Sequence, residues 1–260
     1  MGYWTVVVIV LGAGLLAALF AVAARRLIPL AALRSHHDVA GAVFLQLGVI
    51  FAVLLAFVFN GVRTGYSVAA QAVNQECGSL HGVAILADTL PPPGRTAVLE
   101  GVRAYLTAVI DREWRGMADG RISATATDRF RAAWTAVARV APASPGLGSV
   151  RSEMLAEMAT AHQSRETRLF QMTRALPGLI WVMLIAFTVV LTGFLFAFAV
   201  ENLWSQVVFA AVFAAALALV LVIIRLLDLP FQGALRLPPT DFIRTLHEVV
   251  QLLAAPRPPP

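Results

Sequence analysis

Few side chains in this sequence are spaced for catalysis. Glu76 and His81 could be imagined as an acid and a base, but an i, i+5 separation puts them on different parts of a helix surface, and no nucleophile accompanies them. Glu113 and Trp114 fall in an amphipathic helical pattern, which predicts a surface charge beside a core aromatic ring. The sequence has no phosphate-binding loop, dinucleotide motif or zinc-protease motif. We therefore expect that the protein is not an enzyme.

Metal chemistry has one candidate cluster, formed by His36, His37 and Asp38. No further set of ligands follows at a recognisable spacing, so polar residues at the start of a membrane helix are the better interpretation. The single cysteine, Cys77, excludes an intrachain disulfide and a cysteine-based metal site. We predict no metal ion and no cofactor.

The composition points to a membrane protein. The 260 residues are 59% hydrophobic and 13% charged, and the charged share is about half that of a typical soluble domain. The mean hydropathy is +0.77. A net charge of +5 could suggest nucleic acid, but the charge is spread thinly and no nucleic-acid motif accompanies it. A membrane surface is therefore the better partner, and we expect no nucleic acid.

Four uncharged apolar runs are long enough to cross a bilayer, at about 5–24, 39–59, 176–200 and 203–224. About 20 apolar residues span a hydrocarbon core of roughly 30 Å. The first run could instead be a signal peptide, but the preceding MGYW carries no Arg or Lys and the run is long for that purpose. The sequence predicts an all-α integral membrane protein with four transmembrane helices.

The spans define the domain organisation. Residues 1–60 and 176–227 form two transmembrane hairpins, and 61–175 form a soluble region between them. Apolar residues in this region recur at helical spacing, with a break at 91–94 and a loop at 141–148, so we expect a helical domain. A segment with an amphipathic helix, 228–255, and a disordered proline-rich tail, 256–260, complete the chain.

The second span continues beyond the membrane. After 39–59 the sequence stays compatible with a helix but becomes polar, as far as Glu76. We interpret 39–76 as one helix that leaves the bilayer and continues as a soluble stalk. Gln46 is a strongly polar residue inside the span, and such side chains face other helices or a water-filled path. This is the helix that we expect to line any conducting path.

Four spans place both termini and region 61–175 on one side of the membrane. The arginines beside the third and fourth spans argue that this side is cytoplasmic: Arg165, Arg168, Arg174, Arg225 and Arg236. Three arginines in the first hairpin argue the reverse: Arg25, Arg26 and Arg34. We follow the larger group of arginines and predict that both termini and region 61–175 face the cytoplasm.

Two stretches resemble a known family. LLAFVFNGVRTGYSVAAQAVNQE, residues 54–76, resembles the end of the second membrane helix of bestrophins. DLPFQGALRLPPTDFIRTL, residues 228–246, resembles the bestrophin segment after the fourth helix, with its Pro-Phe-Gly start and later Leu-Pro. From about residue 36 to 250 the layout is similar to that of bacterial bestrophin-like membrane proteins, a family of uncharacterised function, and more distantly to bestrophin anion channels. The resemblance implies a multi-pass protein of the bacterial inner membrane.

The resemblance also implies a homo-oligomer, a pentamer if the bestrophin arrangement holds, that conducts chloride-type anions. In bestrophins the second helix lines the pore and forms an apolar neck at i, i+4 and i+8; the matching positions are Val49, Val53 and Phe57. Asn60 and Arg63 would form the polar exit, and Arg63 would favour anions. Apolar residues at this spacing also occur in membrane helices that only pack.

The sequence departs from the family pattern in two places. Calcium-responsive bestrophins carry an acidic cluster after the fourth helix, whereas this chain has only Asp228 and Asp241 there, so we predict no calcium clasp. The aromatic pair of the bestrophin stalk is also missing after Tyr66.

Four residues after the fourth span are expected to have structural roles. Asp228 is within reach of Arg225 at i, i+3 and would either fix the following segment by hydrogen bonding or form a simple ion pair at the helix end. Pro230, Phe231 and Gly233 would turn the chain so that the last helix packs back on the helical domain.

Two functions remain open from the sequence. The first is an oligomeric anion channel with a path lined by the second transmembrane helix. The alternative is a non-conducting membrane scaffold or sensor whose helical domain binds a partner protein. An enzyme that acts on lipid would need a polar constellation that we do not find in the sequence.

Overall fold

The computed structural model describes residues 2–27, 37–141, 144–198 and 202–255. Within these ranges the regular elements are helices, and no strand is present. The expected connector residue Arg34, the metal-ligand candidate His36 and the proline-rich tail lie outside the described residues.

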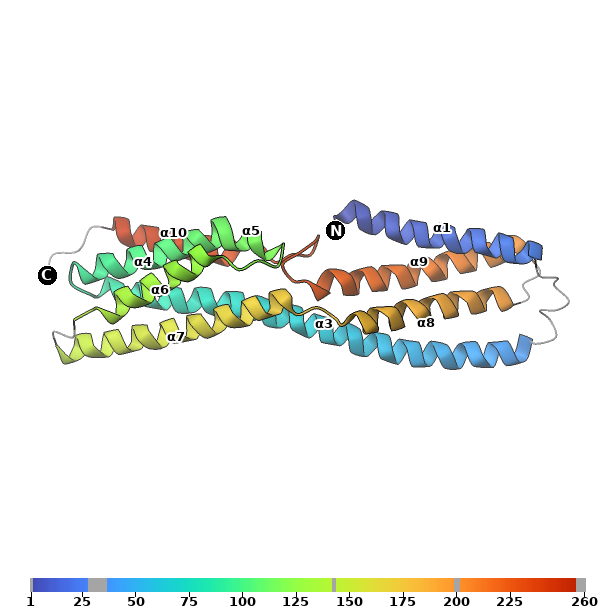
Figure 1. Cartoon of the computed structure of the whole chain (residues 1–260), viewed down its shortest axis with the longest axis horizontal. Coiled ribbons are helices and arrows are strands. Elements are labelled where there is room, and N and C mark those ends of the chain that lie inside the picture. The colour runs from blue at the N-terminus through green and yellow to red at the C-terminus, as the bar shows by residue number, and fades with distance from the viewer. Residues whose placement is uncertain (1, 28–36, 142–143, 199–201, 256–260) are drawn as a thin grey trace. The chain divides into compact units, whose positions relative to one another are not determined.

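Four helices of the described chain are long and apolar enough to cross a membrane, which confirms the predicted topology. They are α1 (Tyr3–Leu27), α3 (His37–Asp88), α8 (Gly178–Ala197) and α9 (Leu203–Asp228) (Figure 1). The boundaries differ slightly from the expected ones. Helix α8 begins two residues later than expected, because Pro177 precedes it with φ −53° and ψ 139°, outside the helical region. Helix α9 continues to Asp228, four residues beyond its uncharged run.

The chain divides into two compact units. The transmembrane unit contains Met1–Thr64 and Ala175–Asp228, and the helical unit contains Gly65–Arg174 and Leu229–Pro260. Helix α3 contributes its first half to the transmembrane unit and its second half to the helical unit, as one uninterrupted helix of 52 residues. The expectation that the second span continues as a stalk is therefore confirmed, and the helix runs 12 residues beyond Glu76, to Asp88.

Small residues bring two helices of the transmembrane unit together. Helices α1 and α9 lie side by side in Figure 1 and share four buried alanines: Ala17, Ala21, Ala210 and Ala214. A Cβ added at Gly14 would lie 3.1 Å from the backbone oxygen of Ala211, so the backbones approach closely there. Small residues commonly permit such approach in membrane helices. A separate apolar cluster, built around Phe51, Leu184 and Leu191, joins α3 to α8.

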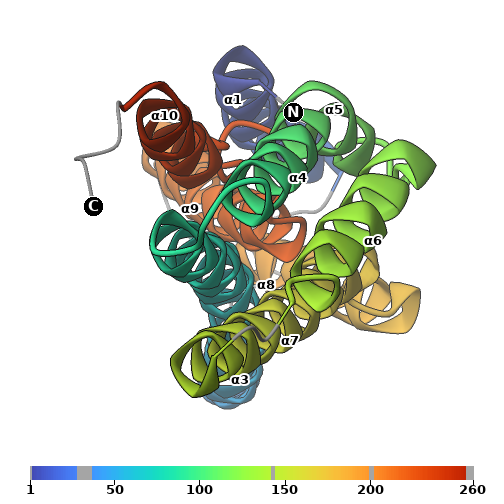
Figure 2. The same ribbon diagram turned by 90° about the vertical axis from the view of Figure 1, so that its left-hand side faces the viewer.

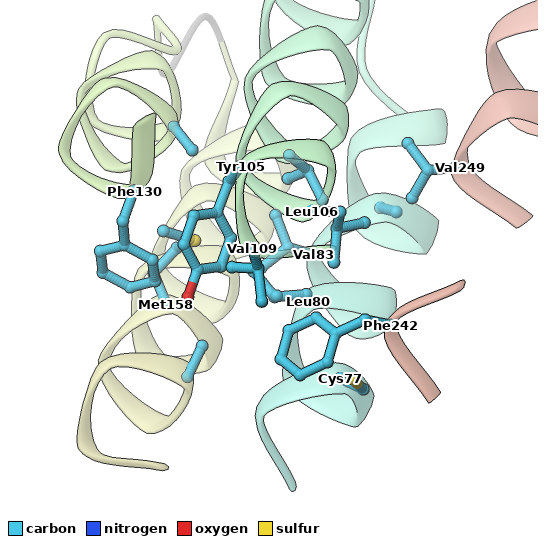
Figure 3. Close-up of a cluster of buried hydrophobic side chains, with 14 of the residues drawn as sticks. Cys77, Leu80, Val83, Tyr105, Leu106, Val109, Phe130, Met158, Phe242 and Val249 are labelled. Carbon is cyan, nitrogen blue, oxygen red and sulfur yellow. The ribbon is translucent and has the colours of Figure 1, made fainter. Parts of the chain in front are cut away.

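The helical unit packs five further helical segments and a short π-helical segment around one core. They are α4 (Gly94–Ala108), η1 (Val109–Glu113), α5 (Trp114–Met117), α6 (Ala124–Ala138), α7 (Pro145–Thr173) and α10 (Thr240–Ala254). In the end-on view, α4 lies beside both α6 and α10 (Figure 2). Side chains from α3, α4, α6, α7 and α10 meet in the core, among them Leu80, Leu106, Met158 and Val249 (Figure 3).

One local expectation for this unit was wrong. Residues 141–148 were expected to be a loop, but α7 begins at Pro145, where Ser144 accepts a hydrogen bond from the backbone N–H of Leu147 and Pro145 occupies the first turn. Both features favour a helix start. The helical pattern predicted after the break at 91–94 is confirmed by α4, and the helix continues through the π-helical segment Val109–Glu113.

Candidate functional site

The transmembrane half of α3 has one packed side and one exposed side. Phe51 is buried against Leu184 and Leu191 of α8. On the exposed side, the expected neck residues Val49, Val53 and Phe57 have 53%, 52% and 74% of their surface accessible. Because they stand at i, i+4 and i+8 of a continuous helix, they share one face of it. The protomer alone does not cover this apolar stripe.

The polar residues expected near the stripe are exposed too. Gln46, Asn60 and Arg63 all lie on α3 with accessible side chains. Arg63 has no ion pair or hydrogen bond within the described residues. An unpaired guanidinium at the end of an apolar helix face can attract anions.

The residues expected to be structural fall into both units. In the transmembrane unit, the Asp228 carboxylate accepts a hydrogen bond from the backbone N–H of Leu176 at 2.8 Å, so it ties the end of α9 to the residues before α8. Its other oxygen lies 3.4 Å from Nη1 of Arg225, so the ion pair forms as well.

In the helical unit, Pro230 and Phe231 are buried, and Gly233 has a φ of +77°, a conformation that side-chain-bearing residues rarely adopt. The Phe231 ring meets Trp114 edge-on at 5.6 Å, and the Trp114 indole N–H donates to the carbonyl of Leu237.

The helical unit contains a buried charge cluster formed by Glu76, Glu113, Arg165 and Arg168. The Arg168 guanidinium is fully buried and donates to Glu76 through Nε at 2.8 Å and through Nη2 at 3.2 Å. Nη2 also donates to Glu113 at 2.8 Å, and Nη2 of Arg165 donates to the other oxygen of Glu113 at 2.6 Å. Two guanidinium groups therefore balance two carboxylates in a site without direct access to water.

Tyr105 completes this cluster, since its hydroxyl donates to Glu76. Burial raises the pKa of Tyr105 well above its usual value, and the negative charge of Glu76 adds to the shift. Burial lowers the pKa of Arg168, but the neighbouring Glu76, Tyr105 and Glu113 outweigh it, so the pKa lies above the usual value. Arg168 is therefore charged and Tyr105 is neutral at physiological pH.

Aromatic rings enclose the Arg168 guanidinium. Its Cζ atom lies 5.3 Å from the ring centre of Phe242 on α10 and 5.7 Å from that of Trp114. Such contacts are worth about 0.5–2 kcal/mol, with the larger values in desolvated sites. One side chain of α7 thus contacts α3, η1, α5 and α10.

The expectation that Glu113 is a surface charge was wrong, because its side chain is fully buried. The expectation of a core role for Trp114 agrees with its packing against Phe231 and Phe242. The charged residues occupy positions that continue the apolar face of their helices. Glu113 follows Val102, Leu106 and Val109 at intervals of three or four residues. Arg165 and Arg168 follow Met154, Met158 and Ala161 at intervals of three, four or seven residues. The position of these charged residues inside apolar stripes was the sequence signal that their side chains are buried.

The cluster does not resemble a catalytic or metal site. Its carboxylates are occupied by guanidinium groups and by the Tyr105 hydroxyl, and a buried net-neutral arrangement leaves no group free to take a proton from a solute. Among the described residues, no group of three or more His, Cys, Asp and Glu side chains is placed to hold a metal ion. The Nδ1 atom of His81 on α3 lies 2.9 Å from Oε2 of Glu248 on α10, and both side chains are partly exposed.

Comparisons with known proteins identify the family. A crystal structure of a bacterial bestrophin homologue from Klebsiella pneumoniae matches with a TM-score of 0.70 and 14% identity, over 94% of this chain and 98% of that chain. A point variant of that homologue matches with a TM-score of 0.72 and 13% identity, over 95% and 99% of the two chains.

At such low identity these matches show a shared fold. A search of curated protein sequences finds no match. The family model for the bestrophin-like domain matches residues 11–242, which is most of the chain. This protein therefore belongs to the bestrophin-like family.

Proposed function

We propose that the protein is a homo-oligomeric anion channel in which the transmembrane half of α3 lines the conducting path. The observation that carries the proposal is the exposed apolar stripe of Val49, Val53 and Phe57 on α3. Helix α3 is the least covered of the four candidate spans. In its most apolar stretch of 18 residues, 6% is buried, against 22% in the corresponding stretch of α9. A helix of this kind requires either lipid or copies of itself around it.

Membership of the bestrophin-like family favours copies of the chain over lipid. Several α3 helices around one axis would bring their stripes together as rings of apolar side chains, and such rings can gate ion passage by excluding water. Phe57 would form the narrowest ring because it is the largest of the three side chains and the most exposed, at 74%. Five copies would be present if the assembly follows the bestrophins.

The residues that follow the stripe suit anions. Asn60 provides an uncharged amide and Arg63 provides a permanent positive charge with no partner among the described residues. A ring of arginines at a pore mouth raises the local anion concentration and repels cations. Chloride-type anions are therefore the proposed solute.

We further propose that the membrane is the bacterial inner membrane and that both termini and the helical unit face the cytoplasm. The arginines flanking the third and fourth spans support this orientation through the positive-inside rule. The free, buried Cys77 is compatible with a reducing compartment. Labelling of single cysteines at exposed positions of the helical unit in right-side-out and inverted vesicles would test the orientation.

Halide flux tests the proposed function. The purified oligomer is reconstituted in liposomes that contain a chloride-quenched dye, and empty vesicles serve as the control. We expect chloride influx above the control, with sodium and potassium excluded. An intact oligomer in the membrane that gives no flux above empty vesicles would contradict the proposal.

The alternative is a non-conducting scaffold or sensor whose helical unit binds a partner protein. A groove of about 610 Å³ along α4 and α6, bordered by Arg131 and Arg139, favours it. The size of the purified particle separates the two functions. A monomer or dimer could not close a ring of α3 helices and would support the alternative.

A further inference from the structure

A long groove runs along α4 and α6 of the helical unit. One part of it, about 610 Å³ in volume, is lined by residues from the start of α4 and the second half of α6. The other part, about 740 Å³, is lined by the rest of α4 and by α6 from Thr125 onward. The two parts share Ala97, Ala132 and Ala136, so they are continuous. We call this surface the α4–α6 groove.

Small side chains form the floor of the groove. Five of the lining residues are alanine or glycine at successive turns of the two helices: Ala97, Gly101, Ala104, Ala132 and Ala136. The two helices themselves pack closely, because a Cβ added at Gly101 would lie 3.1 Å from Cα of Ala133. The distance between packed helices depends on the side chains at the contact, so a third helix can approach this floor closely.

Arginines outnumber acidic residues along the groove. It is lined by five arginines, Arg103, Arg112, Arg129, Arg131 and Arg139, and by three acids, Glu100, Asp111 and Asp128. Two of the acids are already paired, Glu100 with Arg103 at 2.6 Å and Asp128 with Arg131 at 3.5 Å.

The charges that remain are mainly positive. Arg112, Arg129 and Arg139 are exposed and have no ion pair or hydrogen bond in the described part of the chain. Asp111 is the one acid of the described lining that is left without such a partner. The groove therefore offers three unpaired guanidinium groups against one unpaired carboxylate.

The shape and the charge of the groove together define what fits it. Helices α4 and α6 have 15 residues each, so the groove can hold about four turns of a helix, roughly 22 Å. Recognition of an amphipathic helix by a groove places the apolar face of the helix on the floor. A flat anionic bilayer would meet the arginines but leave the floor uncovered. A second copy of this chain has a net charge of +5, the same sign as the groove.

We propose that the α4–α6 groove binds an acidic amphipathic helix of a partner protein. The alanine floor receives the apolar face of that helix, and Arg112, Arg129 and Arg139 meet its carboxylates. Such charge complementarity fixes the partner and its register, and it accelerates association. The inference concerns a surface of the helical unit, so it does not depend on whether the protein conducts.

Peptide binding to the purified full-length protein tests the inference. The probe is a fluorescein-labelled helical peptide of about four turns, with a stripe of leucine and alanine and with glutamates on both sides of the stripe. In the control peptide every glutamate is replaced by glutamine. Measured by fluorescence anisotropy, the acidic peptide should bind at least about tenfold more tightly than the control peptide. The difference should shrink at 1 M salt, where the Debye length falls to about 3 Å.

Charge reversal identifies the surface that the peptide occupies. The double variant Arg112→Glu/Arg129→Glu should weaken binding of the acidic peptide by at least about tenfold. Arg115→Glu/Arg236→Glu is the matched control, because it changes the net charge equally at two exposed arginines that do not line the groove. Its affinity should stay within about twofold of the wild type. If the groove variant does not fold, Arg139→Glu against Arg115→Glu provides the same comparison.

The inference is overturned if the acidic peptide does not bind, or binds no better than the glutamine peptide. Equal weakening in both double variants would show non-specific attraction. Displacement of the peptide by phosphatidylserine vesicles, with the protein held in phosphatidylcholine nanodiscs, would assign the groove to a lipid surface instead. A groove variant that purifies as a smaller particle would assign it to a contact between copies. Chloride flux is measured separately, so a wild type that binds the peptide without conducting would contradict only the proposed function.

Discussion

At the scale of single residues, the buried charge cluster is the most constrained part of the chain. Arg168 donates to both Glu76 and Glu113, and its guanidinium lies against two aromatic rings. A buried ion pair is weak evidence of net stabilisation, because removing charges from water offsets their attraction. Removal of one partner is different, since it leaves the opposite charges buried and unpaired. The cluster therefore makes the fold intolerant of single changes at these positions.

Arg168→Ala tests this view directly. It leaves two buried carboxylates short of hydrogen-bond donors, so we expect the free energy of unfolding to fall by about 3–5 kcal/mol. The measurement is thermal or denaturant unfolding of the purified protein. Arg103→Ala is the control, because Arg103 forms an exposed pair with Glu100 at 2.6 Å, and such pairs contribute about 0–1 kcal/mol. Equal losses in both variants would contradict the assigned role of Arg168.

Because the pKa of Tyr105 is raised in the folded protein, we expect the free energy of unfolding to fall at alkaline pH. In the folded protein its pKa lies well above 10.0, whereas in the unfolded chain it ionises near that value. The unfolded state therefore binds fewer protons once the pH exceeds 10, and the stability that Tyr105 contributes, fully present below pH 10, declines as the pH rises further. Unfolding curves between pH 8 and pH 11.5 should show a steeper decline for the wild type than for Tyr105→Phe. Parallel curves would refute this assignment.

At the scale of helices and strands, hydropathy predicts the elements inside the membrane well. In lipid every backbone N–H and C=O must be paired internally, so a long apolar run has few alternatives to a helix. The continuation of α3 beyond the membrane was predicted as far as Glu76, because the polar stretch after 59 contains no proline; the helix in fact runs to Asp88. Outside the membrane, local patterns were less decisive. The segment PGLG at 145–148 suggests a loop by composition, but the cap at Ser144 makes it the first turn of α7.

The buried cluster could not be predicted in the same way. Helical periodicity identifies which face of α4, α7 or α3 is apolar, but it does not show which charged residues from distant segments meet there. Arg168 and Glu76 are 92 positions apart, so their pairing depends on how the helices pack. The π-helical segment Val109–Glu113 also has no reliable signature in a single sequence.

Helix α10 gives the prediction at this scale. Phe242 is fully buried, beside Trp114 and the Arg168 guanidinium, and it attaches α10 to the core. Phe242→Ala should lower the free energy of unfolding by about 3–5 kcal/mol, from lost burial and the cavity left behind. Ile243→Ala is the control at the neighbouring position. Because Ile243 is 40% exposed, the loss in free energy of unfolding should be smaller than that of Phe242→Ala by at least about 2 kcal/mol. Similar losses for both would indicate that α10 does not dock through Phe242.

At the scale of the whole molecule, one helix belongs to both units. Helix α3 carries the exposed apolar stripe in the transmembrane unit and the buried Glu76 in the helical unit. The helix proposed to line the neck is therefore also attached to the helical unit, through the ion pair of Glu76 with Arg168. The length of this helix and its change of polarity led us to expect that it lines any conducting path, whereas the number of subunits depends on surfaces that a single chain does not reveal.

The conductance of Phe57→Ala tests the central claim most directly. Phe209 on α9 is the matched control, because it is a similarly exposed phenylalanine of the transmembrane unit, at 63% against 74% for Phe57. If the α3 stripe forms the neck, Phe57→Ala widens it and should raise chloride conductance by at least about twofold. Phe209→Ala should leave the conductance at the wild-type value. Unchanged conductance in Phe57→Ala, with the oligomer intact, would contradict the account and assign Phe57 to packing.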